Sequence, residues 1–177
     1  MVRGLRPAFR RGLAATSAIG ALGVIGTLGA SVGLAGCGGP NCGPSEATVT
    51  SVVDGDTIEL DSGERVRYLM IDTPESTGGA TDCFGQNARQ FNSDLVLGKR
   101  VSLDYDQECE DQFGRLLAYV SVDGVEVNSL MVERGYACVL HIPPNGTARV
   151  DEFNLLEAVA RTEGRGMWGL CQEVTCD

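Results

Sequence analysis

The sequence predicts an α+β fold built on a small mixed or closed sheet. β-branched runs separated by turn residues come first in the part of the chain that is expected to fold. Helical periodicity is confined to segments inserted after these runs. Strands that come first, with helices inserted late, are typical of the α+β class.

Three antiparallel strands are expected at the start of the domain, over residues 47–53, 56–61 and 65–71. Asp54-Gly55 supplies a hairpin turn between the first two runs, and Ser62-Gly63-Glu64 turns the chain into the third. Pro74 can neither donate to a sheet nor continue a helix. The third strand should therefore end near Asp72.

Helices and two further strands are expected after this first sheet. Apolar residues recur at roughly helical spacing over 83–97, and Gly98 is placed to end that helix. Strands are expected over 99–106 and 115–122, separated by an acidic loop at 107–114. A short helix over 127–133, an extended piece over 136–142 and a last helix over 150–163 complete the domain.

The first 36 residues have the layout of an export signal. Four basic residues, Arg3, Arg6, Arg10 and Arg11, precede an uncharged run over 13–35 that is rich in Ala, Gly, Leu and Val. The run closes on Leu34-Ala35-Gly36-Cys37, which resembles a bacterial lipobox, where the cysteine is lipidated and the chain is cut before it. A transmembrane anchor is the alternative, because the run is long enough to span a bilayer.

This layout predicts three parts: a cleaved lipoprotein signal peptide over 1–36, a flexible tether over 37–46 with lipidated Cys37, and one folded domain over 47–177. The protein is expected to be exported and anchored by lipid alone to the bacterial envelope, at an outer membrane or the cell surface. A monomer is expected, and export by the general or the twin-arginine route stays open.

The net charge argues against one broad class of function. Outside the first 36 residues the chain has ten basic and 24 acidic residues. A general polyanion binder would show a basic surface, so this class is disfavoured.

Six cysteines remain besides Cys37, which in an exported chain indicates three disulfides. No pair has C-x-x-C spacing and the chain has one histidine, so a zinc site is disfavoured.

Acidic residues gather where two neighbouring strands begin and end. Asp56 opens the second expected strand, and Asp72 and Glu75 lie at the end of the third. Hard oxygen ligands of this kind suit calcium or magnesium. Solvated or helix-capping acids near turns are the alternative for any one of them.

Two arginines, Arg67 and Arg115, lie on the expected third and fifth strands. Guanidinium groups bind phosphate oxygens bidentately and stay charged. A cation, two arginines and a carboxylate base are what phosphodiester hydrolysis needs. For Arg67 considered by itself, a structural ion pair is the favoured interpretation.

Four segments in order, "VVDGDTIEL", "VRYLMIDTPE", "DQFGRLLAYV" and "VNSLMVERGYA", resemble the staphylococcal nuclease (thermonuclease) family. The resemblance runs from about Val49 to Leu170. It implies an OB-fold, a five-stranded β-barrel with three helices, and cleavage of DNA or RNA with calcium to leave 3′-phosphate and 5′-hydroxyl ends.

The resemblance also implies individual roles. Asp56 and Asp72 would bind the metal, Thr73 would contribute its carbonyl oxygen, and Glu75 would reach the metal through water and act as the general base. Arg67 and Arg115 would hold the scissile phosphate and stabilise the transition state.

Two departures from the family affect substrate binding. His141 and Pro143 stand where the namesake nuclease has two tyrosines that hold the nucleotide, and Gln112 and Phe113 stand where it has lysine and tyrosine. Phe113 or His141 could still present a ring for base stacking, and an ordinary edge residue is the alternative for His141.

The family fold further suggests the disulfide pairing Cys83 with Cys109, Cys138 with Cys171, and Cys42 with Cys176. A binding module that has lost catalysis and a structural envelope protein are the competing functional interpretations. The nuclease is favoured because the chain retains all five candidate metal-binding and catalytic residues together: Asp56, Asp72, Glu75, Arg67 and Arg115.

Overall fold

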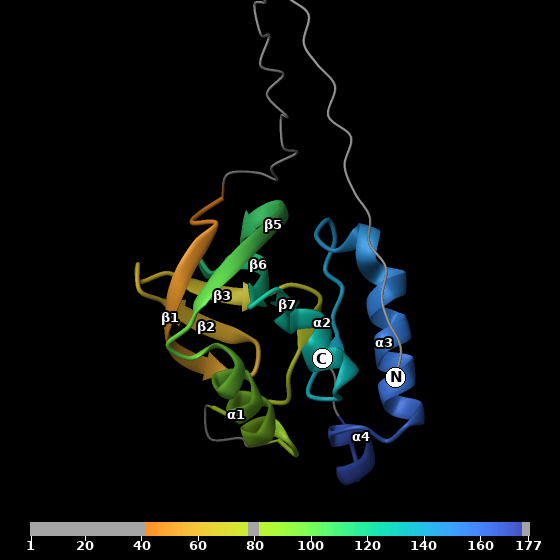
Figure 1. The fold of residues 1–177 in the computed structure, drawn as a ribbon. Coiled ribbons are helices and arrows are strands. Elements are labelled where there is room, and N and C mark those ends of the chain that lie inside the picture. The colour runs from red at the N-terminus through yellow and green to blue at the C-terminus, as the bar shows by residue number, and fades with distance from the viewer. Residues whose placement is uncertain (1–41, 78–81, 175–177) are drawn as a thin grey trace, which may run out of the picture. The chain divides into compact units, whose positions relative to one another are not determined.

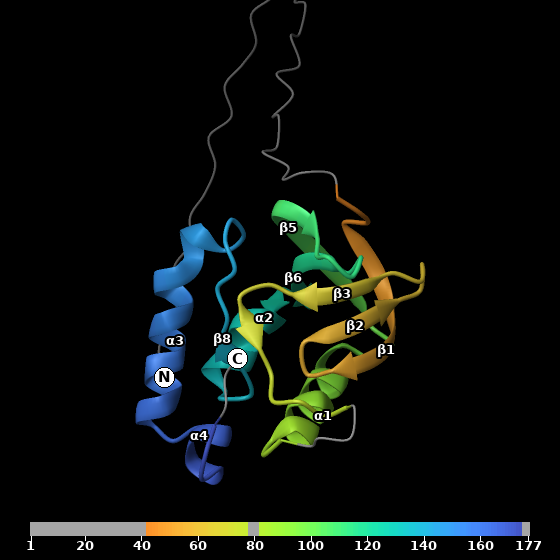
Figure 2. The same ribbon diagram turned by 180° about the vertical axis from the view of Figure 1, so that it is seen from behind.

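The structure, a computed structural model, describes residues 42–77 and 82–174, and its centre is a closed barrel of five strands (Figures 1 and 2). The strands are β1 (Glu46–Asp54), β2 (Thr57–Leu60), β3 (Arg65–Tyr68), β5 (Arg100–Glu110) and β6 (Leu116–Val122). Neighbours pair antiparallel in the order β3-β2-β1-β5-β6, and a parallel pairing of β3 with β6 closes the barrel. The predicted α+β class and the OB-fold are confirmed.

The barrel interior is filled by alternate residues of its strands, as the period of two requires. Val49, Ile58, Val66 and Val120 are fully buried there. Burial of such side chains stabilises the fold by roughly 1.5–3 kcal/mol each. The barrel therefore gives the connecting turns at its rim a rigid base.

Three longer helices and several short elements surround the barrel. The helices are α1 (Gly85–Val96), α2 (Val127–Glu133) and α3 (Val150–Thr162), with a short α4 (Met167–Leu170). The small elements are β4 (Ile71–Asp72), which pairs with β8 (Cys138–Val139), β7 (Val125–Glu126) on the edge of β6, and a 3₁₀ turn at Thr147–Arg149. α1 lies below the barrel, and α2 lies between the barrel and α3 (Figures 1 and 2).

The expected third strand, over 65–71, is interrupted. β3 ends at Tyr68, a turn follows at Leu69 and Met70, and Ile71–Asp72 forms the separate strand β4. The four residues from Tyr68 to Ile71 are all buried, which one strand with alternating faces cannot achieve. Met70 takes a positive φ of 69° to make the turn.

Half of the expected acidic loop at 107–114 is strand. β5 continues to Glu110, and only residues 111–114 form a turn. The buried amide of Asn145 holds the extension, since its Nδ2 donates to the carbonyl oxygen of Glu108 at 2.9 Å and its Oδ1 accepts from the N–H of Glu108 at 2.8 Å. This long-range contact has no signature in the local sequence.

Residues 42–46, which the sequence analysis placed in the tether, are attached to the barrel. The N–H of Leu103 donates to the carbonyl oxygen of Ser45 at 2.8 Å, and Tyr105 donates to that of Pro44 at 2.9 Å. The described part of the domain therefore begins before Ala47. The predicted signal peptide, Cys37 and the rest of the tether lie outside the described residues.

The predicted disulfide pairing is wrong. Cys42 is bonded to Cys109 and Cys83 to Cys171. Cys109 lies on β5 beside the N-terminal segment and not in a loop facing α1, so it meets Cys42. Cys138 is disulfide-bonded too. Its expected partner, Cys171, is taken by Cys83, and Cys176 lies outside the described residues.

No helix in the described residues combines the length and the apolar character needed to cross a membrane.

Candidate active site

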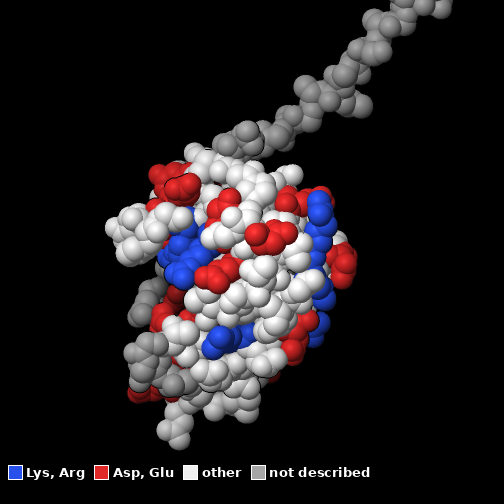
Figure 3. Space-filling model, turned by 90° about the vertical axis from the view of Figure 1, so that its left-hand side faces the viewer, with Lys and Arg blue, Asp and Glu red and all other residues white. Residues whose placement is uncertain are grey.

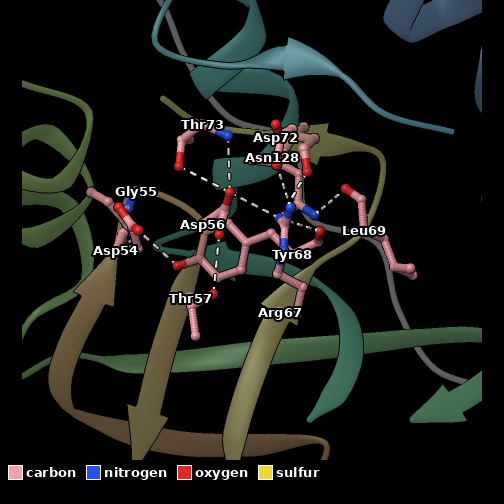
Figure 4. Close-up of polar contacts among 12 residues, drawn as sticks. Asp54, Gly55, Asp56, Thr57, Arg67, Tyr68, Leu69, Asp72, Thr73 and Asn128 are labelled. Atoms are coloured by element: carbon pink, nitrogen blue, oxygen red, sulfur yellow. Dashed lines mark hydrogen bonds and ion pairs between the residues drawn. The ribbon is translucent and has the colours of Figure 1, made fainter. Parts of the chain in front are cut away.

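The turn between β1 and β2 holds Asp56 in a buried position. The carboxylate is 6% exposed, and its Oδ2 accepts hydrogen bonds from the N–H and the hydroxyl of Thr73, both at 2.9 Å (Figure 4). Gly55 makes this approach possible, because a Cβ there would lie 2.7 Å from the Thr73 side chain. The β1–β2 turn is thereby bonded to the segment that follows β4.

Arg67 joins the two aspartates that the sequence singled out. Its Nη1 lies 3.0 Å from Oδ2 of Asp56, and its Nη2 donates to Oδ1 of Asp72 at 2.8 Å (Figure 4). Nη1 also donates to the carbonyl oxygen of Ile71 at 2.8 Å. The side chain is 13% exposed, so this ion-pair cluster is largely removed from solvent.

Thr73 and Pro74 end the short strand β4 and aim the following residue toward solvent. Both are buried, whereas Glu75 is exposed. The N–H of Asp82 donates to the carbonyl oxygen of Glu75 at 3.0 Å, and the N–H of Glu75 donates to Oδ2 of Asp82 at 3.3 Å. A side chain at Gly85 would collide with the Glu75 carbonyl, so glycine lets α1 pack against this segment.

Negative charges surround the Glu75 carboxyl group. Partial burial raises its pKa, and the charges of Asp54, Asp56, Asp72 and Asp82 raise it further. Asp54 itself is fixed by hydrogen bonds to its Oδ1 from the hydroxyl of Ser76 at 2.7 Å and from the N–H of Gly55 at 2.8 Å. Glu75 therefore lies at the edge of a cluster of carboxylates.

Arg115 enters the same region from the start of β6. Its Nε donates to Oδ2 of Asp111 at 2.7 Å, and its N–H donates to Oδ1 at 3.0 Å. Burial by itself would raise the pKa of Asp111, but hydrogen bonds from Arg115 and from the N–H of Phe113 outweigh it and lower the pKa. Asp111 thus fixes the guanidinium group from one side.

Two hollows meet at the arginines. The first, of about 210 Å³, is lined by the acids Asp54, Asp56, Asp72 and Glu75, by Arg65, Arg67 and Arg115, and by Val53, Thr57 and Thr77. The second, a cleft of about 410 Å³, shares Arg67 and Arg115 and continues over the apolar residues Tyr68, Leu69, Met70, Ile71, Leu117, Leu140 and Ile142 and the polar residues Glu108, Glu110, Asp111, Gln112 and Asn145. A charged site and a mostly apolar cleft thus lie side by side.

The amino-acid sequence of this domain matches a known family. The profile described as staphylococcal nuclease homologue covers residues 65–169. The chain is 34% identical over 134 residues to endonuclease YncB of Bacillus subtilis, with 72% of this chain and 64% of that protein covered. It is 37% identical over 122 residues to a thermonuclease of Staphylococcus intermedius, with 66% of this chain and 70% of that protein covered.

The chain belongs to the staphylococcal nuclease family. It spans less than two thirds of YncB, and it spans 44% of a prophage-derived endonuclease, YokF, of Bacillus subtilis to which it is 35% identical over 129 residues. Family membership therefore refers to the barrel domain described above.

Within this nuclease-family domain, the structure brings together most of the residues that the sequence singled out. Asp56, Asp72, Glu75, Arg67 and Arg115 all line the first hollow. Thr73 does not line this hollow, but it donates hydrogen bonds to Asp56, which does. The convergence could be expected from the strand ends, because neighbouring strands deliver their ends to one rim of a barrel.

The two residues expected to present rings do not line the apolar cleft. Phe113 is 74% exposed, and its ring centroid lies 5.5 Å from the guanidinium carbon of Arg115. The Nε2 of His141 lies 3.4 Å from the hydroxyl of Thr147. Leu140 and Ile142, on either side of His141, face the cleft instead.

Sequence reasoning missed Asp54 and Asp111. Asp54 was assigned only to the hairpin turn, although it lies among the acids that act on Glu75. Asp111 was placed in an acidic loop, yet it fixes Arg115. The spacing of four residues between Asp111 and Arg115 was the one feature of the sequence that could have indicated this ion pair.

The residues fit a hard divalent cation by their chemistry. Asp56 and Asp72 supply carboxylate oxygens, and the repulsion that raises the pKa of Glu75 is what a cation would relieve. In the described part of the chain, no three metal-binding side chains converge on one point, and Arg67 links the two aspartates. A bound cation would therefore share these carboxylates with Arg67.

Proposed function

We propose that this protein is a nuclease that hydrolyses phosphodiester bonds of DNA, RNA or both. The proposal depends on one observation: Arg67 and Arg115 line the same hollow as a cluster of carboxylates that includes the exposed Glu75. Relatives named endonuclease and thermonuclease support the same activity. A module that only binds nucleic acid has no need for an exposed base beside two arginines.

The arginines would bind the scissile phosphate through guanidinium nitrogens that make no hydrogen bond within the described residues. Asp111 occupies Nε of Arg115, and neither terminal nitrogen of that side chain has a partner in the described residues. Arg67 likewise keeps Nε open while Nη1 and Nη2 bind carbonyl and carboxylate oxygens. Guanidinium groups fixed in this way stabilise the extra negative charge of the pentacoordinate phosphorus.

Glu75 would act as the general base. Its carboxylate takes a proton from the attacking water, while Asp54 and Asp82 hold its segment in place. We further propose calcium as the metal, held by Asp56, Asp72 and the carbonyl oxygen of Thr73, with Glu75 reaching it through water. When bound, it would polarise a phosphate oxygen and offset the charge of the carboxylates. Cleavage would leave 3′-phosphate and 5′-hydroxyl ends.

The test is hydrolysis of single-stranded DNA and RNA by the oxidised protein, with calcium and with a chelator. Calcium-dependent cleavage should fall about a hundredfold or more in both Glu75→Gln and Arg115→Ala. Glu64→Gln and Arg134→Ala remove equal charges outside the site and should retain activity. Intact nucleic acid under every condition, from protein shown to be folded, would reject the nuclease in favour of a binding module.

We also propose that the protein is exported and attached to the bacterial envelope through Cys37. Support comes from the sequence: a basic start, an uncharged run and a lipobox-like end. Mass spectrometry of the protein from the membrane fraction should find a lipid on Cys37. A Cys37→Ser variant should be recovered without lipid, and an intact, unmodified N-terminus in the wild type would refute the anchor.

A further inference from the structure

Arg89 and Lys99 differ from the other basic residues of the domain. Residues 42–77 and 82–174 contain ten Lys and Arg side chains, and eight of them form ion pairs with carboxylates at 4.0 Å or less. Arg89, on α1, and Lys99, just after α1, have no carboxylate partner within those residues. In an acidic protein, these two positive charges remain uncompensated.

Arg89 borders a polar groove between β1 and α1. The groove has a volume of about 360 Å³ and is lined by Thr50, Ser51, Val52, Gln86, Arg89, Gln90, Ser93 and Leu97. None of these side chains is acidic, and hydroxyl, amide and guanidinium groups all donate hydrogen bonds to phosphate oxygens. The Nε of Arg89 donates to the carbonyl oxygen of Val52 at 3.3 Å, which fixes the side chain against the groove wall.

Along β1, the groove is next to the first hollow described above, which we call the catalytic hollow. Val53 and Asp54, the next residues of β1, line that hollow, and at 3.3 Å per residue Val52 lies within about 7 Å of Asp54 along the strand. From the other wall, Nε2 of Gln86 donates to the carbonyl oxygen of Ser76, the neighbour of Glu75, at 2.9 Å. A polynucleotide that follows β1 out of the catalytic hollow would reach this groove.

The opposite direction is unfavourable for a phosphate backbone. The apolar cleft beyond Arg67 and Arg115 has Glu108, Glu110 and Asp111 on its wall. These carboxylates disfavour further phosphates by like-charge repulsion. On the side of the molecule that carries β1 and α1, Lys and Arg form separate patches, and the lowest of them lies among neutral side chains (Figure 3).

We propose that the β1–α1 groove is a subsite for the phosphate backbone of the substrate, with Arg89 contacting a phosphate beyond the scissile one. Lys99 extends the positive charge past the far end of the groove. This inference rests on the proposed nuclease function and specifies its substrate as a polynucleotide long enough to reach Arg89. A dinucleotide occupies the catalytic hollow and the cleft alone.

The first arm of the test measures kinetics on two substrates, a thymidine dinucleotide and a long single-stranded oligonucleotide. Arg89→Gln should raise KM for the oligonucleotide about fivefold and leave kcat/KM for the dinucleotide unchanged, and Arg89→Lys should restore most of the loss. Arg134→Gln, an exposed arginine paired with Glu133, removes the same charge elsewhere and should change neither. Equal effects of Arg89→Gln on both substrates, or none on either, would overturn the subsite.

The second arm measures binding without cleavage. In a Glu75→Gln background, fluorescence anisotropy of a labelled oligonucleotide should show about fivefold weaker binding for Arg89→Gln, with the slope of log K against log salt reduced by about 0.7. This arm separates the two proposals. If Arg89→Gln weakens binding but the wild type does not cleave, the groove is kept and the nuclease is rejected. If the wild type cleaves but Arg89→Gln leaves binding unaltered, the nuclease is kept and the groove is rejected.

Discussion

At the scale of single residues, the site depends on acids that position arginines. Arg67 contacts Asp56 and Asp72, and Arg115 contacts Asp111. Each acid holds a guanidinium group in place and reduces its rotamer freedom, so less entropy is lost when phosphate binds. The same acids reduce the net positive charge that the substrate meets. At Arg67 and Arg115, the paired acids therefore improve the position of the guanidinium group and at the same time weaken its attraction for phosphate.

Replacing Asp111 separates these two effects. Asp111→Asn keeps the shape but weakens the hydrogen bonds to Arg115, so the guanidinium group becomes mobile. We expect kcat/KM to fall about tenfold, because a misplaced catalytic group loses part of its orientation advantage. Steady-state kinetics on single-stranded DNA would measure this. An increase in kcat/KM would show that charge neutralisation by Asp111 matters more than positioning.

The same carboxyl group should affect stability in acid. The folded pKa of Asp111 is below its usual value of 3.8, because bonds from Arg115 outweigh the effect of burial. A lowered pKa contributes stability that is present above the unfolded value and is lost as pH falls through the folded value. Below about pH 4, the free energy of unfolding should therefore fall more steeply in the wild type than in Asp111→Asn. Urea titrations across this range would show it, and parallel curves would contradict the assignment.

At the scale of elements, the sequence predicted the barrel strands and helices. It did not predict the turn that interrupts the third strand or the extension of β5. Runs such as 47–53 and 127–133 carry their own periodicity. The turn at Leu69 and Met70 depends on Asn128, a buried residue of α2 whose Nδ2 donates to the carbonyl oxygen of Leu69 at 2.9 Å (Figure 4). The strand extension to Glu110 depends likewise on Asn145. Tertiary hydrogen bonds between distant segments decided both cases.

The candidate site also has features that the sequence could predict and features that it could not. Asp56, Asp72 and Arg67 could be predicted to converge because Asp56 begins one expected strand and Arg67 and Asp72 belong to the next expected strand. The disulfides could not, since fifteen connectivities are possible for six cysteines and the choice depends on which surfaces face each other. Cys109 was misplaced because its segment was expected to be a loop. It bonds Cys42, and Cys83 bonds Cys171 instead, so all three predicted pairs are wrong.

The disulfides make a prediction at this scale. The Cys42–Cys109 bond fixes the β5 extension that forms one wall of the apolar cleft, and Cys83–Cys171 ties the start of α1 to the end of α4. Their sequence separations are 67 and 88. Each bond should stabilise the fold by about 2–5 kcal/mol through the unfolded state. Denaturation of the paired serine variants would measure the loss. Unchanged unfolding free energies would contradict this.

At the scale of the whole molecule, local positive charge must act within a long-range negative field. Ten basic and 24 acidic residues lie outside the first 36 positions. Eight of the ten cations in the described residues are paired with carboxylates. The field around the domain would thus repel a polynucleotide, while in the proposed mode of binding Arg67, Arg115 and Arg89 would attract it at contact.

The salt dependence of binding should distinguish the long-range repulsion by the acidic surface from the short-range attraction by the arginines. At 0.01 M salt the screening length is about 30 Å, so acids all over the domain oppose binding, whereas at 0.1 M it is about 10 Å and only nearby charges act. Above that concentration, release of counterions from the contacted phosphates weakens binding, with a log–log slope of about −0.7 per contact. Binding of a single-stranded oligonucleotide to Glu75→Gln should therefore be tightest near about 0.1 M and weaken on both sides. Anisotropy titrations over this range would test it. Affinity that falls steadily from the lowest salt upward would show that the arginines act without interference from the acidic surface.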